Sequence, residues 1–127
     1  MDTKKLIEEA KNAMEYAYVP YSGFRVGAAL LCEDGSIYTG CNIENAAYGP
    51  TNCAERTAFF KAVSEGKREF TAIAVISDSD TFTAPCGVCR QVMSEFCGPD
   101  FQILMCNSKK EYQTISLGEL LPFAFSL

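Results

Sequence analysis

At 127 residues, of which 48% are hydrophobic, the chain is long enough to bury a core and is expected to form one domain over residues 1–127. Its net charge of −5 argues against nucleic acid as a partner, because basic surfaces supply most of the affinity for polynucleotides. No apolar run approaches the roughly 18 residues of a membrane span, and the polar amino terminus is unlike a signal peptide, so we expect no membrane partner and no export.

A first helix is predicted from Asp2, its N-cap, to about Tyr18. Apolar residues recur there at helical spacing on one face, and charged residues fill the other. Val19-Pro20 ends the helix, because a residue before proline is pushed out of the α region.

A β-hairpin is predicted next. The apolar run 24–32 and the return at 37–42 flank Glu33-Asp34-Gly35-Ser36, a strong turn sequence. Residues 43–52 then read as an irregular loop, and loops that a rigid sheet supports often carry binding groups.

The second half of the chain alternates helix and strand. A second helix is predicted to begin at Cys53 and to end before Gly66, a typical residue after a helix end. Residues 70–76 are continuously apolar, which predicts a strand buried on both faces. A third helix begins near Cys86 and stops at Gly98-Pro99. The remaining predicted elements are a strand over 101–106, an edge strand over 112–115, a short helix from Ser116 into Leu121-Pro122 and an apolar tail over 123–127.

Strands flanked by helices, with a β-α-β unit over 70–106, predict an α/β layer protein. Its sheet is expected to be mixed, because the first two strands form a hairpin. If the strands before the second and third helices run parallel, both helices start at the same edge of the sheet, where open α/β sheets bind ligands. The residues that would then converge are Cys53, Glu55, Cys86 and Cys89.

These residues form two short motifs, Cys53-Ala54-Glu55 and Pro85-Cys86-Gly87-Val88-Cys89. The chain has seven cysteines and no histidine, so a metal site must draw on Cys, Glu or Asp, and in a reducing cytoplasm the cysteines are expected to be thiols or metal ligands. Three thiols are too few to close a structural zinc site, whereas a catalytic zinc keeps one position open for water. The two motifs resemble the signature of zinc-dependent nucleobase deaminases, in which the Glu moves protons and is not a ligand. We expect one Zn²⁺ per chain, bound by Cys53, Cys86 and Cys89.

The positions of these cysteines suit metal binding. Zinc binds thiolates, and helix amino termini, where Cys53 and Cys86 are predicted to lie, favour negative charge. Cys89 lies one turn after Cys86 on the same helix face. Three thiolates on one Zn²⁺ leave a net negative charge, and we expect Arg56 and Arg90, which directly follow site residues, to compensate it.

Other interpretations stay open at this point. Glu55 taken alone would more often be part of a capping box with Asn52 as N-cap. A Cys-x-x-Cys pair at a helix start can be redox active, although that explains neither Cys53 nor Glu55. A zinc-stabilised binding module without catalysis would need a fourth protein ligand. The cysteines that would have to supply it, and that are otherwise expected to be small core residues, are Cys32, Cys41, Cys97 and Cys106.

Beyond the two motifs, the whole chain resembles the small, homotetrameric cytidine deaminases. The stretches that carry the resemblance are Pro20-Tyr21-Ser22 with Phe24, Val26-Gly27-Ala28-Ala29, Gly40-Cys41-Asn42-Ile43-Glu44-Asn45-Ala46, Cys53-Ala54-Glu55-Arg56, Pro85-Cys86-Gly87-Val88-Cys89-Arg90-Gln91 and Leu120-Leu121-Pro122. Gly49-Pro50-Thr51 does not match, and the tail after Phe125 is short. The resemblance implies a cytidine-deaminase-like fold, three layers of α/β/α around a five-stranded mixed sheet.

The resemblance also implies a reaction, the hydrolytic deamination of free cytidine and deoxycytidine to uridine and deoxyuridine plus ammonia, a step of pyrimidine salvage. The zinc would lower the pKa of a water, and Glu55 would carry protons from this water to N3 and to the departing amine. A polynucleotide-editing deaminase is disfavoured by the acidity of the chain. A deaminase of the same fold that acts on a modified nucleoside or a nucleoside antibiotic stays open, as does the preference between ribose and deoxyribose.

The implied substrate residues lie mostly in the predicted loop after the hairpin. Asn42 and Glu44 would hold the ribose hydroxyls, Phe24 would pack on the pyrimidine, and backbone groups near Ala54 would read the base. Two further residues, Tyr48 and Phe125, would line the pocket of a neighbouring subunit in the homotetramer. Without the resemblance, Asn42 and Glu44 would be local hydrogen bonders in a turn, and Phe24 would be a core residue.

Overall fold

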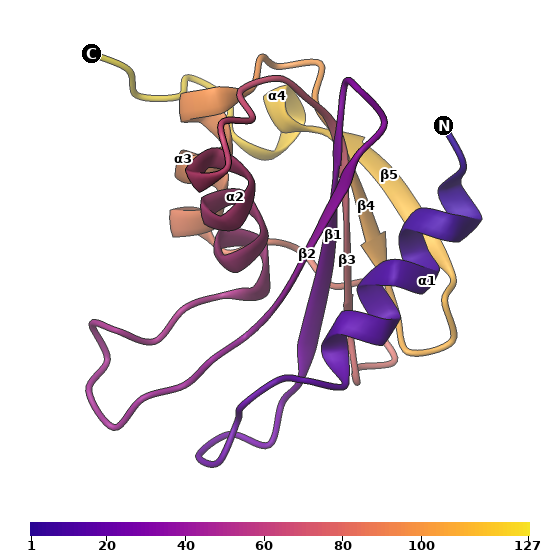
Figure 1. The fold of residues 1–127 in the computed structure, drawn as a ribbon, viewed down its shortest axis with the longest axis vertical. Coiled ribbons are helices and arrows are strands. Elements are labelled where there is room, and N and C mark those ends of the chain that lie inside the picture. Colours follow the sequence, from indigo (N-terminus) through magenta and orange to yellow (C-terminus); the bar gives the residue numbers. More distant parts are fainter.

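A five-stranded mixed sheet forms the centre of the computed structural model, which describes all residues 1–127 (Figure 1). The strands are β1 (Val26–Cys32), β2 (Ile37–Cys41), β3 (Phe70–Ser77), β4 (Gln102–Cys106) and β5 (Tyr112–Ser116), in the spatial order β2-β1-β3-β4-β5. β1 pairs antiparallel with both β2 and β3, and β3 pairs parallel with β4, so β2, β3 and β4 run in the same direction. The predicted mixed sheet is confirmed.

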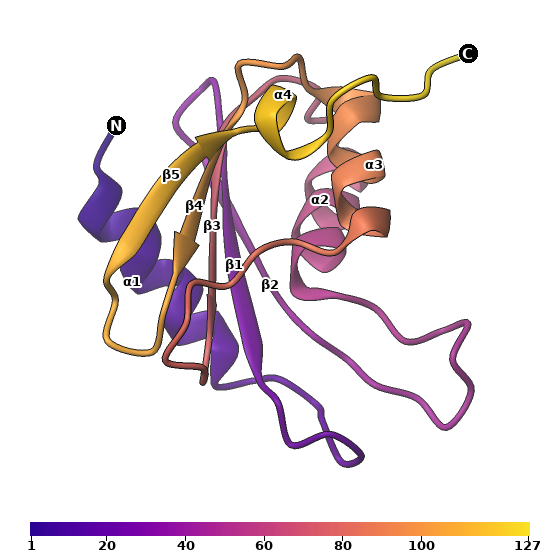
Figure 2. The ribbon, with the colours of Figure 1, turned by 180° about the vertical axis from the view of Figure 1, so that it is seen from behind.

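Helices cover both faces of this sheet (Figure 2). α1 (Thr3–Met14) lies on one face, and α2 (Ala54–Ser64), α3 (Gly87–Phe96) and the short α4 (Leu117–Leu120) lie on the other. Each face has its own apolar core: Leu6 and Ile7 pack with Ile76 under α1, and Phe59 packs with Met93 under α2 and α3. This is the predicted three-layer α/β/α arrangement.

Close contact between α1 and the sheet depends on a glycine in β1. A Cβ atom at Gly27 would lie 2.0 Å from the carbonyl oxygen of Ala10 and 2.8 Å from the amide nitrogen of Met14. Only a residue without a side chain fits there, and the helix can therefore lie directly against the strand.

The end of α1 differs from the prediction. Asp2 caps the helix as expected, because its Oδ1 accepts the N–H of Lys5 at 3.0 Å. The helix stops at Met14, however, and not near Tyr18. The chain continues in tighter turns, and the N–H of Tyr18 then donates to the carbonyl of Asn42 at 3.0 Å. A long-range partner therefore ends the helix before the proline does.

The other boundaries agree with the sequence to within a residue or two. β1 begins at Val26 and not at Phe24, because side chains of Ser22 and Asn42 take the backbone groups of Phe24. Gly66 follows α2 with a φ of 93°, in the left-handed region that glycine tolerates. Ser116 caps α4 by accepting the N–H of Glu119. None of the helices is long and apolar enough to cross a membrane.

Candidate metal centre and substrate site

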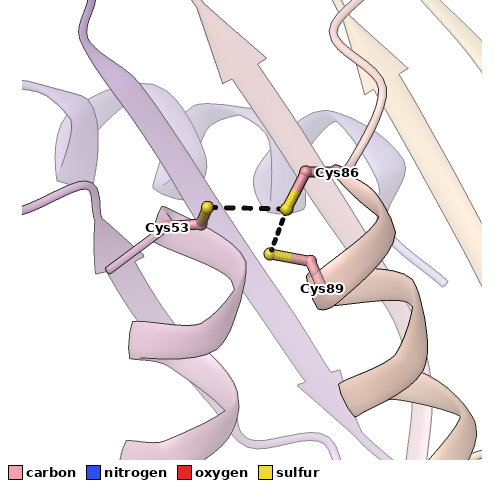
Figure 3. Close-up of side chains that lie close together, drawn as sticks. All are labelled: Cys53, Cys86 and Cys89. Carbon is pink, nitrogen blue, oxygen red and sulfur yellow. Dashed lines mark hydrogen bonds between the residues drawn. The ribbon is translucent and has the colours of Figure 1, made fainter. Parts of the chain in front are cut away.

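The two predicted zinc motifs meet at one edge of the sheet. β2 and β3 are parallel, so the loops that follow them reach α2 and α3 from the same edge. Cys53 is the N-cap of α2, Cys86 is the N-cap of α3, and Cys89 lies in the first turn of α3. Their sulfurs face one another (Figure 3), with 3.7 Å between the Sγ atoms of Cys53 and Cys86 and 3.4 Å between those of Cys86 and Cys89.

This spacing fits a metal and not a disulfide. Zinc binds thiolate sulfur at about 2.3 Å, and three corners of a tetrahedron at that distance lie about 3.8 Å apart. Sulfurs in a disulfide are only about 2.05 Å apart, and all seven cysteines are free. The ligand atoms of the three site cysteines lie within 4.8 Å of one another, and no other Cys, Asp or Glu joins this group. The donor set therefore leaves one tetrahedral position open, and the closed, four-ligand binding module is not supported.

The thiols have different electrostatic environments. The hydrogen bond with Cys89 is the main cause that lowers the pKa of Cys53, which falls to about 5 despite partial burial, and hydrogen bonds from Arg56 and Cys86 add to the effect. The same contact with Cys53, together with burial, raises the pKa of Cys89 above its usual range. Arg56 Nη2 lies 3.2 Å from the Cys53 sulfur. Arg56 therefore places its positive charge beside Cys53, the thiol whose pKa is lowered.

Arg90 makes its side-chain hydrogen bonds with backbone carbonyls. Its Nε donates to the carbonyl of Pro85 at 2.8 Å and its Nη1 donates to the carbonyl of Leu120 at 2.9 Å. None of its hydrogen bonds reaches a thiol. Of the two arginines expected to offset the thiolate charge, Arg56 is the one that donates to a thiol, and this role stays a prediction for both.

Glu55 is the second residue of α2 and is buried, with 4% of its surface exposed. Burial is the main cause that raises the pKa of its carboxyl to about 7. The capping-box alternative is wrong, because Cys53 is the N-cap and makes no side-chain cap bond. Asn52 donates its Nδ2 to the hydroxyl of Thr57 instead. Glu55 is therefore a buried carboxyl beside the thiols that has no capping role.

The residues predicted to bind the ribose, Asn42 and Glu44, lie next to the start of β1. Asn42 accepts the N–H of Val26 at 2.9 Å and donates to the carbonyl of Phe24 at 2.8 Å. Glu44 accepts the backbone N–H groups of Tyr21 and Ser22 and the Ser22 hydroxyl. The Ser22 hydroxyl is the main cause that holds the pKa of Glu44 below its usual value. The structure thus places Phe24, Asn42 and Glu44 side by side, with their local hydrogen bonds made.

A hollow of about 430 Å³ opens beside Glu44. The residues that line it are Tyr21, Ser22, Glu44, Asn45, Ala46, Tyr48 and Thr51. Thr51, in the stretch that the family pattern did not explain, accepts the N–H of Asn45 and donates to the carbonyl of Ala47, so its hydroxyl holds the loop together. Ala54 is fully buried at the start of α2. Tyr48 and Phe125 are 96% and 68% exposed in this single chain.

One residue that supports the site was not singled out from the sequence. Arg25, next to Phe24, donates from Nε and Nη2 to the two carboxylate oxygens of Asp78 at 3.0 and 3.1 Å, and from Nη1 to Glu15. It thereby connects the start of β1 with the end of β3. The available signal was a single charged residue inside the apolar run 24–32.

Three thiols converge at this sheet edge and leave one coordination position of a metal free, and a buried carboxyl that belongs to no capping box lies beside them. These are the features of a zinc-dependent deaminase. Known proteins agree with this class. A sequence model of the cytidine and deoxycytidylate deaminase zinc-binding region matches residues 1–105. The chain is 59% identical over 126 residues to a cytidine deaminase of Sporosarcina psychrophila, covering 99% of this chain and 93% of that relative.

Solved structures give the same result. The crystal structure of a cytidine deaminase from Burkholderia pseudomallei superposes with a TM-score of 0.95 at 51% identity, covering 98% of this chain and 100% of that one. That of a cytidine deaminase from Mycobacterium tuberculosis superposes with a TM-score of 0.87 at 41% identity, covering 100% and 99%. The chain belongs to the cytidine and deoxycytidylate deaminase family and contains its zinc-binding region.

Proposed function

We propose that this protein is a hydrolase that converts free cytidine and deoxycytidine to uridine and deoxyuridine with release of ammonia, a reaction of pyrimidine salvage. The observation that carries the proposal is the open three-thiol set with the Glu55 carboxyl buried beside it. The relatives of high identity that are named cytidine deaminases support the choice of substrate.

The residues divide the reaction between them. When bound by Cys53, Cys86 and Cys89, the zinc lowers the pKa of a water toward neutrality. Glu55 accepts one proton from the attacking water and delivers it to N3; it then takes the remaining proton of the hydroxyl added at C4 and hands it to the departing amine. The water oxygen adds to C4, the bond between C4 and the amine breaks, and one ammonia leaves for each uridine formed. Arg56, which donates to Cys53, offsets part of the thiolate charge.

Asn42 and Glu44 keep enough hydrogen-bonding capacity to bind the ribose. The Asn42 amide uses one donor and one acceptor on Phe24 and Val26, and it has one of each to spare. Glu44 accepts three hydrogen bonds of the roughly four that a carboxylate can take. Phe24, which is 43% exposed, offers its ring to the pyrimidine, and backbone groups near Ala54 read the base edge.

The proposal includes a homotetramer. The side chains of Phe123 and Leu127 are fully exposed in the single chain, and Phe125 and Tyr48 are largely so. Contiguous exposed apolar surface usually marks an interface. In the assembly, Tyr48 and Phe125 would complete the pocket of a neighbouring subunit. Light scattering at assay concentration is expected to give a tetramer, and a fully active monomer would refute this part.

A cytoplasmic setting and a single catalytic domain over residues 1–127 complete the proposal. The cytoplasm is favoured because the metal needs Cys53, Cys86 and Cys89 as thiolates and every cysteine of the chain is unpaired. All five strands belong to one sheet, which supports the single domain. We include no nucleic-acid partner, because the net charge of −5 disfavours binding to a polynucleotide and the proposed substrate is a free nucleoside.

A spectrophotometric assay tests the substrate. Cytidine, deoxycytidine and cytosine are incubated with the zinc-loaded protein in parallel, and loss of the cytosine-ring absorbance is followed. We expect turnover of both nucleosides and almost none of the free base. Turnover of cytosine at a comparable rate, or of none of the three, would contradict the proposed function.

A further inference from the structure

Arg90 connects three segments that are distant in sequence. Its own N–H makes the first helical bond of α3, to the carbonyl of Cys86 at 3.0 Å. Its guanidinium donates to the carbonyl of Pro85, which is fully buried and directly precedes Cys86, and to the carbonyl of Leu120, the last residue of α4. One side chain therefore holds the turn that presents the second thiol and the end of a helix thirty residues further on.

The C-terminal segment 121–127 leaves from this same point and runs past α3 (Figure 2). Gln91, the next residue of α3, donates its Nε2 to the carbonyl of Phe125 at 3.1 Å. These contacts fix the backbone of the segment and leave the side chains of Phe123 and Phe125 exposed. Phe123 adopts a φ of 56°, so the chain turns sharply just before the part that Gln91 holds.

The chemistry of this connection favours arginine. A guanidinium is planar, and its donors point in fixed, different directions, so it can hold two carbonyls at once. Hydrogen bonds from a charged donor are roughly twice as strong as neutral ones. The carbonyl of Leu120 at the end of α4 is among those that a helix end leaves without an intrahelical partner. A lysine carries its charge at one point and cannot reproduce this geometry.

We propose that Arg90 is a positioning residue that couples the placement of the Pro85-Cys86 turn to that of the C-terminal segment. The inference rests on the zinc centre and the homotetramer of the proposed function. Loss of the guanidinium frees the carbonyls of Pro85 and Leu120 together. Zinc should then leave faster, and the subunits should separate at higher protein concentration.

The chain offers a matched control in Arg68. Its Nη1 also donates to two backbone carbonyls, those of Val63 and Lys67, each at 2.8 Å. These acceptors lie at the carboxyl end of α2, the end opposite Cys53. Arg68→Met therefore removes the same kind of side chain and the same kind of bonds at a place with no connection to the thiols.

The experiment compares Arg90→Met, Arg90→Lys, Arg68→Met and the unaltered protein, each loaded with zinc and without nucleoside. The rate of zinc transfer to an excess of a chromogenic chelator is measured, and light scattering on serial dilution gives the subunit dissociation. Changes next to metal ligands typically cost about 10- to 100-fold in metal affinity. We expect zinc transfer from Arg90→Met to be faster by roughly that factor, with dissociation at higher concentration.

Arg90→Lys is expected to lie between Arg90→Met and the unaltered protein in both measurements, and Arg68→Met to match the unaltered protein in both. The lysine variant keeps the test decisive if the methionine variant does not fold. Unchanged zinc transfer or unchanged dissociation in both Arg90 variants would overturn the coupling, as would an equal effect of Arg68→Met. Neither measurement uses cytidine. A protein that binds zinc but does not deaminate cytidine would therefore refute the proposed function and leave this inference standing.

Discussion

Replacing Glu55 with Gln distinguishes a proton shuttle from a residue that only supports the fold. Glutamine has nearly the same shape as glutamate, but it can neither accept the proton of a water nor deliver one to N3. A general acid–base group typically contributes about 10²- to 10⁴-fold, and Glu55 serves more than one proton transfer. We therefore expect kcat to fall at least ~10³-fold, with the zinc retained.

The stability of the zinc-free protein should change in the opposite direction. Burial raises the pKa of Glu55 from 4.5 to about 7, so the folded state keeps this proton to a higher pH than the unfolded state. Between these two pH values only the folded state holds the proton, and the free energy of unfolding therefore decreases as pH rises. At about 1.4 kcal/mol per pH unit, the decrease amounts to about 3 kcal/mol, and Gln avoids it.

The measurements are zinc content, steady-state cytidine turnover and denaturant unfolding of the chelator-treated protein at pH 4 and pH 8. At pH 8 the zinc-free Glu55→Gln variant should be the more stable protein, and at pH 4 the two should be alike. A capping role, which Gln can also fill, would cost the variant at most ~1 kcal/mol and would give no gain in stability at pH 8. A variant that keeps its zinc and more than a tenth of the unaltered rate would refute the proton shuttle.

Three further predictions concern the metal, the ribose and the packing of α1. X-ray absorption of the loaded protein should show three sulfurs and one oxygen around the zinc, and four sulfurs would contradict a catalytic site. Glu44→Ala should impair cytidine turnover mainly through substrate recognition. The loss includes the acceptor for the N–H groups of Tyr21 and Ser22. Kinetics like those of the unaltered protein would exclude Glu44 from ribose binding. Gly27→Ala should lower the free energy of unfolding, measured by denaturant titration, by ~1 to 3 kcal/mol or more, because its Cβ would overlap the Ala10 carbonyl. Gly49→Ala is the control: its Cβ would meet nothing within 4 Å, so the same titration should show almost no change.

The features that the sequence predicted correctly depend on local patterns. Helical periodicity located the first helix, apolar runs and turn sequences located the strands, and the capping residues Asp2 and Ser116 marked two helix starts. The convergence of the thiols required one topological condition, that the strands before the second and third helices run parallel, and the structure meets it because β1 lies antiparallel between them. The three-thiol donor set followed from the resemblance of the two cysteine motifs to the zinc-dependent deaminase signature.

The features that the sequence did not predict depend on partners far along the chain. α1 ends early because Tyr18 pairs with Asn42. Arg90 was expected to offset the thiolate charge because it follows Cys89; its guanidinium also donates to the carbonyl of Leu120, an acceptor that no local pattern predicts. Arg56 lies three residues after Cys53, a spacing that puts both on one helix side, and it does reach the sulfur.

The starts of α2 and α3 differ from the other helix starts in a way that bears on folding. α1 and α4 have a side-chain oxygen that accepts a backbone N–H, whereas Cys53 and Cys86 occupy the N-cap positions without such a bond. A missing cap typically costs about 1 kcal/mol. The same two residues are proposed zinc ligands, so a metal bound there would join the two helix starts that lack a side-chain cap. A zinc bound there would tie the starts of both helices to each other, so we expect metal loading to stabilise the two first turns that have no side-chain cap.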